Sequence, residues 1–144
     1  MSKIICSPGS YIQGNGEMGR LAEYYRLLGT KGAYLIVDRF IDQTYHDLIT
    51  GSFEREHVLH SVHIFGGECS VQEIETHRSQ LDGADVVIGI GGGKTLDTAK
   101  AVSFYARIPI IVVPTAASTD APCSRLSVVY TPEGEFDFYL PLTS

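Results

Sequence analysis

Three consecutive glycines mark the segment with the clearest chemical potential, Gly89-Ile90-Gly91-Gly92-Gly93-Lys94-Thr95-Leu96-Asp97. Glycine lets a backbone approach a ligand closely, and the free N–H groups and dipole of a following helix attract an anion. The segment is neither a P-loop nor a G-x-G-x-x-G fingerprint, because Ile88 and Lys94 stand where those motifs require glycine. A tight turn between a strand and a helix would also use glycine, but three in a row exceed that need. The segment therefore predicts a pyrophosphate site.

A second candidate is Asp38, which directly follows the apolar run 33–37. A carboxylate at the end of a buried strand can accept hydrogen bonds from both hydroxyls of an adenine ribose, and it repels a 2′-phosphate. Aspartate is also a favoured helix N-cap. From the residues alone, both interpretations of Asp38 stand.

The segment 114–124 is almost uncharged and suits neutral hydroxylated ligands or the amide of a nicotinamide. It carries four hydroxyl side chains and one carboxylate: Thr115, Ser118, Thr119, Ser124 and Asp120. A Ser/Thr-rich loop can also use such groups for local capping. Its expected position at the ligand-binding edge of a sheet favours a functional role.

The histidines invite a metal-binding interpretation, but their pattern argues against it. Alternation along a strand places His60 on the opposite face from His57 and His63, whereas a tetrahedral metal site needs converging ligands. We interpret these three as surface groups of an outer strand. His46 and His77 are expected on solvent-facing sides of helices.

Composition excludes several classes of protein. A net charge of -6 argues against a surface that follows a phosphate backbone. No run approaches the roughly 20 apolar residues that span a bilayer, so a membrane partner is not expected. The first residues lack the apolar core of a signal peptide. Three cysteines, without C-x-x-C spacing, fit a reduced cytoplasmic compartment, and Cys123 is interpreted as a small buried residue.

Apolar runs and helical patterns alternate through the chain and predict the scaffold. This order predicts an α/β fold, a Rossmann-like parallel sheet with helices on both faces, which binds ligands beyond the carboxyl ends of its strands. The expected strands are 33–37, 58–65, 85–90 and 110–113, with a short β-hairpin region at 124–130 and 136–140 and a possible strand pair at 4–6 and 11–14. The expected helices are 17–28, 41–49, one capped by Ser70 and Glu73, and 93–106.

Taken together, these segments resemble the glycerol dehydrogenase family, a branch of the iron-type (group III, metal-dependent) alcohol dehydrogenases. The resemblance covers essentially the whole chain, and the glycine segment followed by Ser-Thr-Asp-Ala-Pro is its most specific part. The matching segments are 7–9 with 11–14, 65–70, 89–100, 114–115 with 118–124, and 133–137.

The resemblance implies NAD-dependent oxidation of glycerol or a related small polyol to the hydroxyketone. In this family the substrate alkoxide sits on a divalent metal, usually zinc, which acts as a Lewis acid while hydride leaves to the nicotinamide. Asp120 would hold the substrate hydroxyls. The residues implied in cofactor binding are Asp38 at the adenine ribose, Gly92, Gly93, Lys94, Thr95, Leu96 and Asp97 at the pyrophosphate, Thr115 and Ser118 in the cleft, and Ser124, Leu126 and Tyr130 beside the nicotinamide.

Length is the one large departure from the family. Family chains are more than twice as long, and their metal ligands, an Asp and two His, belong to a helical C-terminal domain. We therefore expect residues 1–144 to be the dinucleotide-binding domain, inactive alone, and the full-length form to be a homo-oligomer. The alternatives are a non-catalytic dinucleotide-binding fragment, or dehydroquinate synthase or glycerol-1-phosphate dehydrogenase. Segment 115–124 has no cationic residue for a phosphorylated substrate, which favours a neutral polyol.

Overall fold

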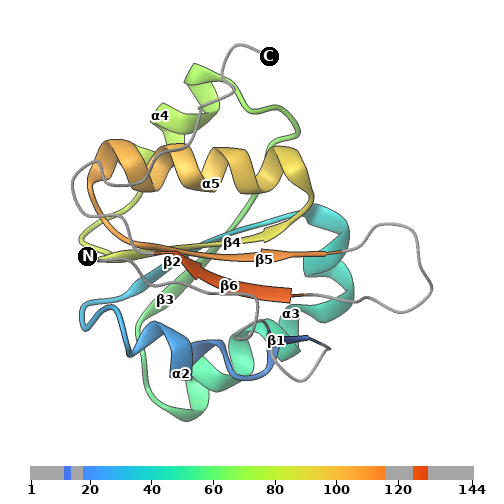
Figure 1. Cartoon of the computed structure of the whole chain (residues 1–144), viewed down its shortest axis with the longest axis vertical. Helices are drawn as coiled ribbons and strands as arrows, with labels where there is room; N and C mark the ends of the chain where they lie inside the picture. Colours follow the sequence, from blue (N-terminus) through green and yellow to red (C-terminus); the bar gives the residue numbers. More distant parts are fainter. Residues whose placement is uncertain (1–11, 14–17, 116–124, 130–144) are drawn as a thin grey trace.

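A computed structural model describes residues 12–13, 18–115 and 125–129 of the chain. Strands and helices alternate through most of this range (Figure 1). The elements are β1 (Ile12–Gln13), α2 (Leu21–Tyr25), β2 (Ala33–Val37), α3 (Arg39–Arg55), β3 (His60–Ile64), α4 (Val71–Ser79), β4 (Val86–Gly91), α5 (Gly93–Ala106), β5 (Ile110–Pro114) and β6 (Arg125–Val129).

The strands form one sheet in the order β1-β6-β5-β4-β2-β3. The four strands β2, β3, β4 and β5 are mutually parallel, which confirms the predicted parallel α/β core. β6 is antiparallel to β5 and also pairs with β1, so Ile12–Gln13 lies beside Arg125–Val129. The expected strands 4–6 and 136–140 lie outside the described residues.

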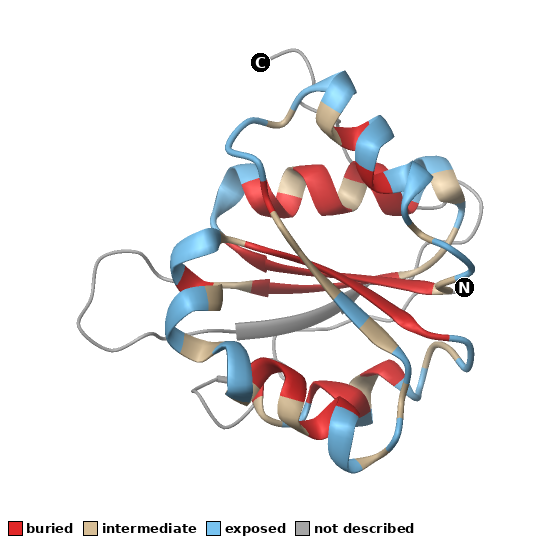
Figure 2. Ribbon diagram, turned by 180° about the vertical axis from the view of Figure 1, so that it is seen from behind, coloured by how far each residue is buried: buried red, intermediate tan, exposed pale blue. Residues whose placement is uncertain are grey.

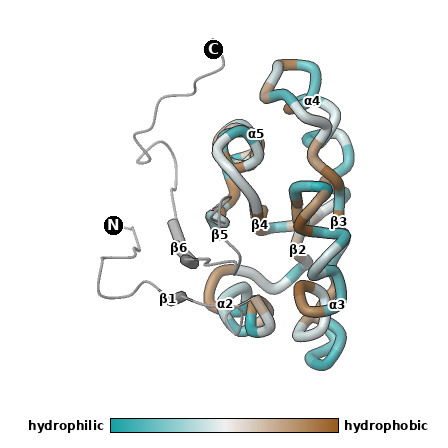
Figure 3. Tube along the Cα trace, turned by 90° about the vertical axis from the view of Figure 1, so that its right-hand side faces the viewer, coloured by the Kyte–Doolittle hydropathy of each residue, from teal (hydrophilic) through white to brown (hydrophobic). Residues whose placement is uncertain are grey.

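Helices cover both faces of the sheet, which Figure 3 shows end-on. On one side α2 and α3 pack on the sheet around Leu35, Ile88 and Phe53, and on the other side α4 and α5 pack around Tyr34, Ile74 and Val102. Because both faces are covered, every residue of β2 and β4 is buried, as expected for central parallel strands (Figure 2). No described helix is long and apolar enough to cross a membrane.

Two helix boundaries differ from expectation. α3 runs from Arg39 to Arg55 rather than 41–49, because the chain continues through Gly51 and Ser52 to bury Phe53 against the core. α2 covers only Leu21–Tyr25 of the expected 17–28, because the backbone tightens after Tyr25 into hydrogen bonds that span three residues. The predicted start of α4 is confirmed, since the Glu73 N–H donates to the Ser70 hydroxyl at 3.1 Å.

The expectation for His77 was wrong. The residue is only 3% exposed, because its side chain turns from α4 toward the sheet and meets Tyr34. His60 and His63 do lie on opposite faces of the edge strand β3, but both are half-buried: His60 stacks on Phe53 and His63 on Tyr34. His46 is exposed as expected, beside Asp42.

Candidate cofactor-binding site

The order of the strands locates the edge at which a ligand would bind. From β2 the chain moves outward to β3 and then crosses back to β4 on the other side of β2. The carboxyl ends of β2 and β4 are therefore the topological switch point, where doubly wound sheets bind ligands. The two ends are directly joined, since the Asp38 N–H donates to the Ile90 carbonyl at 3.0 Å.

A cavity of about 360 Å³ opens at this switch point. Its lining comes from three connections: the turn after β2, the loop after β3 and the glycine turn after β4. The lining residues are Asp38, Arg39, Phe65, Gly66, Gly67, Gly92, Gly93, Lys94 and Thr95. Five residues predicted from the sequence, Asp38 and the run 92–95, are thus brought to one place.

The glycines after β4 have different roles. Gly91 has φ +151°, and a Cβ there would lie 3.0 Å from the Asp38 Cβ, so this position requires glycine. A Cβ on Gly92 or Gly93 would meet no atom within 4 Å. Since Gly92 and Gly93 line the cavity, side chains at these positions would occupy space that is open to a ligand.

The N-terminus of α5 faces this cavity without an anion of its own. Its N-cap, Gly92, has no side chain to accept a hydrogen bond, and the first turn of α5 contains no acidic residue. In contrast, Asp38 caps α3 and Ser70 caps α4, and both helices have an acid in the first turn. Within the described residues no side chain caps this 14-residue helix, so its first N–H groups and its dipole favour an external anion.

Asp38 is a helix N-cap, which is one of the two interpretations that the sequence left open, and its role at a ribose stays a prediction. Its Oδ2 accepts hydrogen bonds from the N–H groups of Phe40 at 3.1 Å and Ile41 at 3.3 Å, so it is an N-cap. Its Oδ1 has no hydrogen-bond partner among the described residues, and Asp38 is one of the residues that line the cavity. One oxygen thus fixes the side chain while the other can accept a hydrogen bond from a ligand.

Other predicted residues lie elsewhere. Leu96 packs in the core beneath α5, and Asp97 is half-buried on α5 outside the cavity lining. Thr115 is tied to the glycine turn, since its N–H donates to the Gly91 carbonyl at 3.1 Å. Leu126 lies on β6. Ser118, Asp120, Ser124 and Tyr130 lie outside the described residues.

The loop after β3 is the part of the lining that residue-by-residue reasoning missed. Phe65, Gly66 and Gly67 line the cavity. The next residue, Glu68, pairs with the lining residue Lys94, with the Lys94 Nζ 3.1 Å from the Glu68 Oε2. The signal in the sequence was a Gly-Gly pair directly after a strand, at the same edge as the other two loops.

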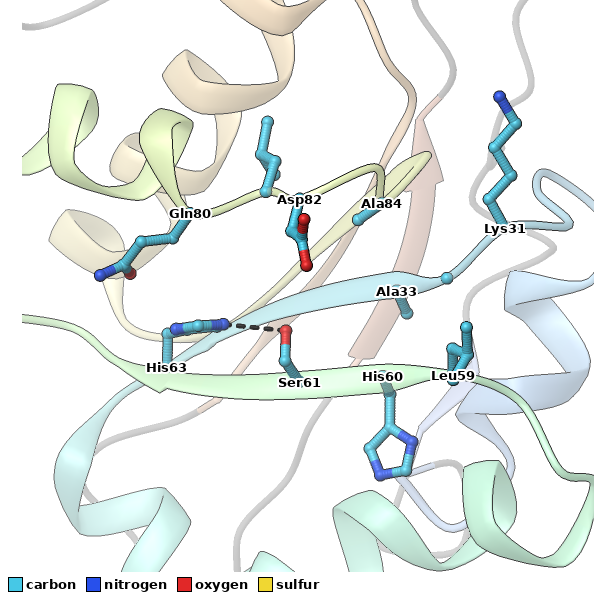
Figure 4. Close-up of a pocket in the computed structure, with 11 residues that line it drawn as sticks. Lys31, Ala33, Leu59, His60, Ser61, His63, Gln80, Asp82 and Ala84 are labelled. Carbon is cyan, nitrogen blue, oxygen red and sulfur yellow. Dashed lines mark hydrogen bonds between the residues drawn. The ribbon is translucent and has the colours of Figure 1, made fainter.

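Cavity size does not by itself distinguish this site. A pocket of about 370 Å³ lies near the amino ends of β2 and β3, between β3 and the α4–β4 connection (Figure 4). There the Ser61 hydroxyl and the His63 Nε2 already hydrogen-bond each other at 2.8 Å. Burial, followed by the nearby His77, lowers the pKa of His63, so His63 favours its neutral form. The switch-point cavity differs because it includes a helix N-terminus that no described side chain caps.

Comparison with known proteins identifies the family. Residues 8–140 match the family described as iron-containing alcohol dehydrogenase. The chain belongs to this family. It is 45% identical over 144 residues to a glycerol dehydrogenase of Pseudomonas putida, covering 99% of this chain and 39% of that protein. It is 49% identical over 135 residues to a glycerol dehydrogenase of Thermotoga maritima, covering 92% of this chain and 36% of that protein.

A solved structure supports the same assignment. The crystal structure of a probable glycerol dehydrogenase from Sinorhizobium meliloti matches with a TM-score of 0.61 and 38% identity, over 78% of this chain and 32% of that chain. The chain spans 39% and 36% of the lengths of the two curated relatives named above. Within the described ranges, no group of three or more His, Cys, Asp or Glu side chains could hold a metal ion, so these residues do not fit a metal site.

Proposed function

We propose that this chain is the NAD-binding half of a dehydrogenase that oxidises glycerol or a related small polyol to the hydroxyketone. The observation that carries the proposal is the uncapped N-terminus of α5, which opens into a cavity that also contains the Asp38 carboxylate. A dinucleotide has the matching groups, an anionic pyrophosphate and a ribose with two adjacent hydroxyls. The glycerol dehydrogenases among its relatives support the substrate class.

In this proposal different described residues bind different groups of the cofactor. The N–H groups of Gly92, Gly93 and the residues after them donate to the pyrophosphate, and the exposed Lys94 ammonium contributes positive charge. The Asp38 Oδ1 accepts from the adenine ribose, which favours NAD over NADP because a 2′-phosphate would meet a carboxylate. Leu96 and Asp97 support the site from within α5.

The remaining assignments concern the substrate side. We propose that Thr115 and Ser118 line the cofactor cleft, that Asp120 holds the substrate hydroxyls, and that Ser124, Leu126 and Tyr130 flank the nicotinamide. The proposal includes a zinc ion, whose chemistry is to lower the pKa of the alcohol, with its ligands in a helical C-terminal domain of the longer protein. It also places the full-length protein in the cytoplasm as a homo-oligomer, without nucleic-acid or membrane partners.

The proposal is tested with two preparations, the 144-residue chain and a version extended to the length of its relatives. NADH binding is measured by calorimetry, and turnover is measured by NADH absorbance with glycerol and zinc. We expect both proteins to bind NADH and only the longer one to oxidise glycerol. Absence of NADH binding by both proteins would refute the proposal. Zinc-dependent turnover by the short chain would refute the division into halves, and binding without turnover in either form would favour a non-catalytic module.

A further inference from the structure

We propose that Glu73 is a positioning residue for the cofactor cleft and that, together with the buried His77 and Tyr34, it fixes the Gly66–Gly67 wall. The ligand in this inference is the dinucleotide of the proposed function. The geometry of the wall does not depend on that identification. Glu73 itself is absent from the cavity lining, so its effect on a ligand would be indirect.

The Glu73 carboxylate departs from the usual behaviour of its motif. In a capping box, the acidic side chain returns to the backbone N–H of the N-cap residue. Here the Ser70 half of the box is present, but the Glu73 Oε2 accepts instead from the Gly66 N–H at 2.8 Å. The carboxylate therefore joins the first turn of α4 to the loop that lines the cavity.

The same oxygen also contacts a buried histidine of α4, His77. The His77 Nε2 lies 2.8 Å from the Glu73 Oε2, and the His77 side chain is 4% exposed. An ionised carboxylate can only accept hydrogen bonds, so Nε2 carries a proton directed at Glu73. A charge-assisted bond of this kind, shielded from water, holds the carboxylate in one orientation.

The chain of hydrogen bonds continues to the centre of the sheet. The hydroxyl of Tyr34, which is fully buried on β2, lies 2.7 Å from the His77 Nδ1 and 3.1 Å from the Gln80 Oε1. The ring of His63 stacks on Tyr34 with ring centroids 3.9 Å apart, and in Figure 4 His63 and Gln80 lie on the same side of β3. The Gly66 N–H is thus connected through Glu73 and His77 to a central strand.

The space around Gly66 shows that the carboxylate determines where the wall lies. A Cβ on Gly66 would lie 2.6 Å from the Glu73 Oε1, so the loop rests directly on the carboxylate. On the next residue, Gly67, a Cβ would meet nothing within 4 Å, and its φ of +111° favours glycine. Without Glu73, the Gly66–Gly67 wall would lose the hydrogen bond that fixes its position opposite the N-terminus of α5.

The test compares Glu73→Ala and Glu73→Gln with Glu75→Ala. Glu75 is an exposed acid on the same helix whose ion pair within the described residues is with Arg78, so its variant controls for loss of charge from α4. We expect Glu73→Ala to weaken NADH binding about tenfold by calorimetry. Glu73→Gln should restore binding, because an amide oxygen can accept both hydrogen bonds, and Glu75→Ala should bind as the wild type does.

A second readout does not require a ligand. The hydrogen-exchange rate of the Gly66 amide, measured by NMR, should rise in Glu73→Ala and stay slow in Glu73→Gln and Glu75→Ala. If Glu73→Ala does not fold, Glu73→Asp replaces it, since its shorter side chain keeps the charge but cannot reach both partners.

Unchanged exchange at Gly66 in the folded variant would overturn the inference, as would unchanged NADH affinity in a chain whose wild type binds NADH. If the wild type binds no NADH, the proposed function fails, while the exchange rates still decide the role of Glu73.

Discussion

The two ends of the parallel strands use the same backbone chemistry in opposite ways. At the carboxyl end, no side chain of the described residues caps the N–H groups at the start of α5. At the amino end, the turn before β2 presents the N–H groups of Thr30, Lys31 and Gly32, and the Asp85 carboxylate accepts all three at 2.8, 3.0 and 3.2 Å. We call the N–H groups of Thr30, Lys31 and Gly32 the closed cluster, because the Asp85 side chain accepts their hydrogen bonds. We call the N–H groups at the start of α5 the open cluster, because no described side chain caps them.

In the closed cluster, the hydrogen bonds to Asp85 change the pKa values of the groups involved. Burial alone would raise the pKa of Asp85, but the hydrogen bonds from Thr30 and Lys31, from the Tyr25 hydroxyl and from Gly32 outweigh it and hold the pKa below its usual value. Burial, followed by the hydrogen bond and charge of Asp85, raises the pKa of Tyr25 to about 12, so its hydroxyl stays a donor. By comparison, the open cluster lacks the acceptor that a ligand would supply.

Blocking the open cluster should produce the largest effect. Gly93→Val places a side chain in the cavity and should weaken NADH binding more than about a hundredfold by calorimetry. The fold should tolerate it, because a Cβ on Gly93 meets no atom within 4 Å. Gly51→Val, on the middle of α3, is the matched control and should bind normally. A folded Gly93→Val chain with wild-type affinity would show that the pyrophosphate does not bind here.

Removing the built-in anion should affect stability instead of binding. Asp85→Ala leaves three backbone donors and the Tyr25 hydroxyl without their acceptor, and it should lower the free energy of unfolding by roughly 3 kcal/mol in urea titrations. NADH affinity should be unchanged while the protein is folded. The control is Asp82→Ala, which removes a nearby exposed acid. A loss of stability no larger than that control would show that the closed cluster contributes little.

The pH dependence should separate the two ends further. Because folding lowers the pKa of Asp85, its stabilisation is fully present above the unfolded value of about 4 and is lost as the pH falls through the folded value. Urea titrations of the wild type and Asp85→Asn should therefore converge in free energy of unfolding as the pH falls below about 4. A difference between them that does not depend on pH would mean that the charge of Asp85 is not what stabilises the turn.

The smallest expected effect concerns cofactor choice at Asp38. Asp38→Asn keeps a good helix N-cap for α3 but removes the carboxylate charge. The preference for NADH over NADPH, measured as a ratio of dissociation constants, should fall about tenfold, mainly because NADPH binds better. Asp42→Asn, in the first turn of the same helix, controls for the general loss of charge. Equal affinities for both cofactors in the wild type would contradict the role of Asp38.

Local sequence patterns determined most of the scaffold and three of its local features. Uninterrupted apolar runs predicted β2, β4 and β5, because strands buried on both faces have no polar side to reveal. Short-range chemistry predicted the Ser70 cap, the glycine turn after β4 and the position of Asp38 at the end of β2. These features depend on residues that are neighbours in the chain.

Only the tertiary structure decided which residues share a site and which are buried. The loop after β3 joins the cavity because β3 lies beside β2, an order of strands that no local pattern specifies. His77 is a polar residue on a helix with weak amphipathicity, and its burial follows from the packing of α4 against Tyr34 on β2. Likewise, the Asp85 carboxylate meets Thr30 across 55 positions of sequence. Contacts between distant residues arise from packing whole elements together, so the spacing of residues could not reveal them.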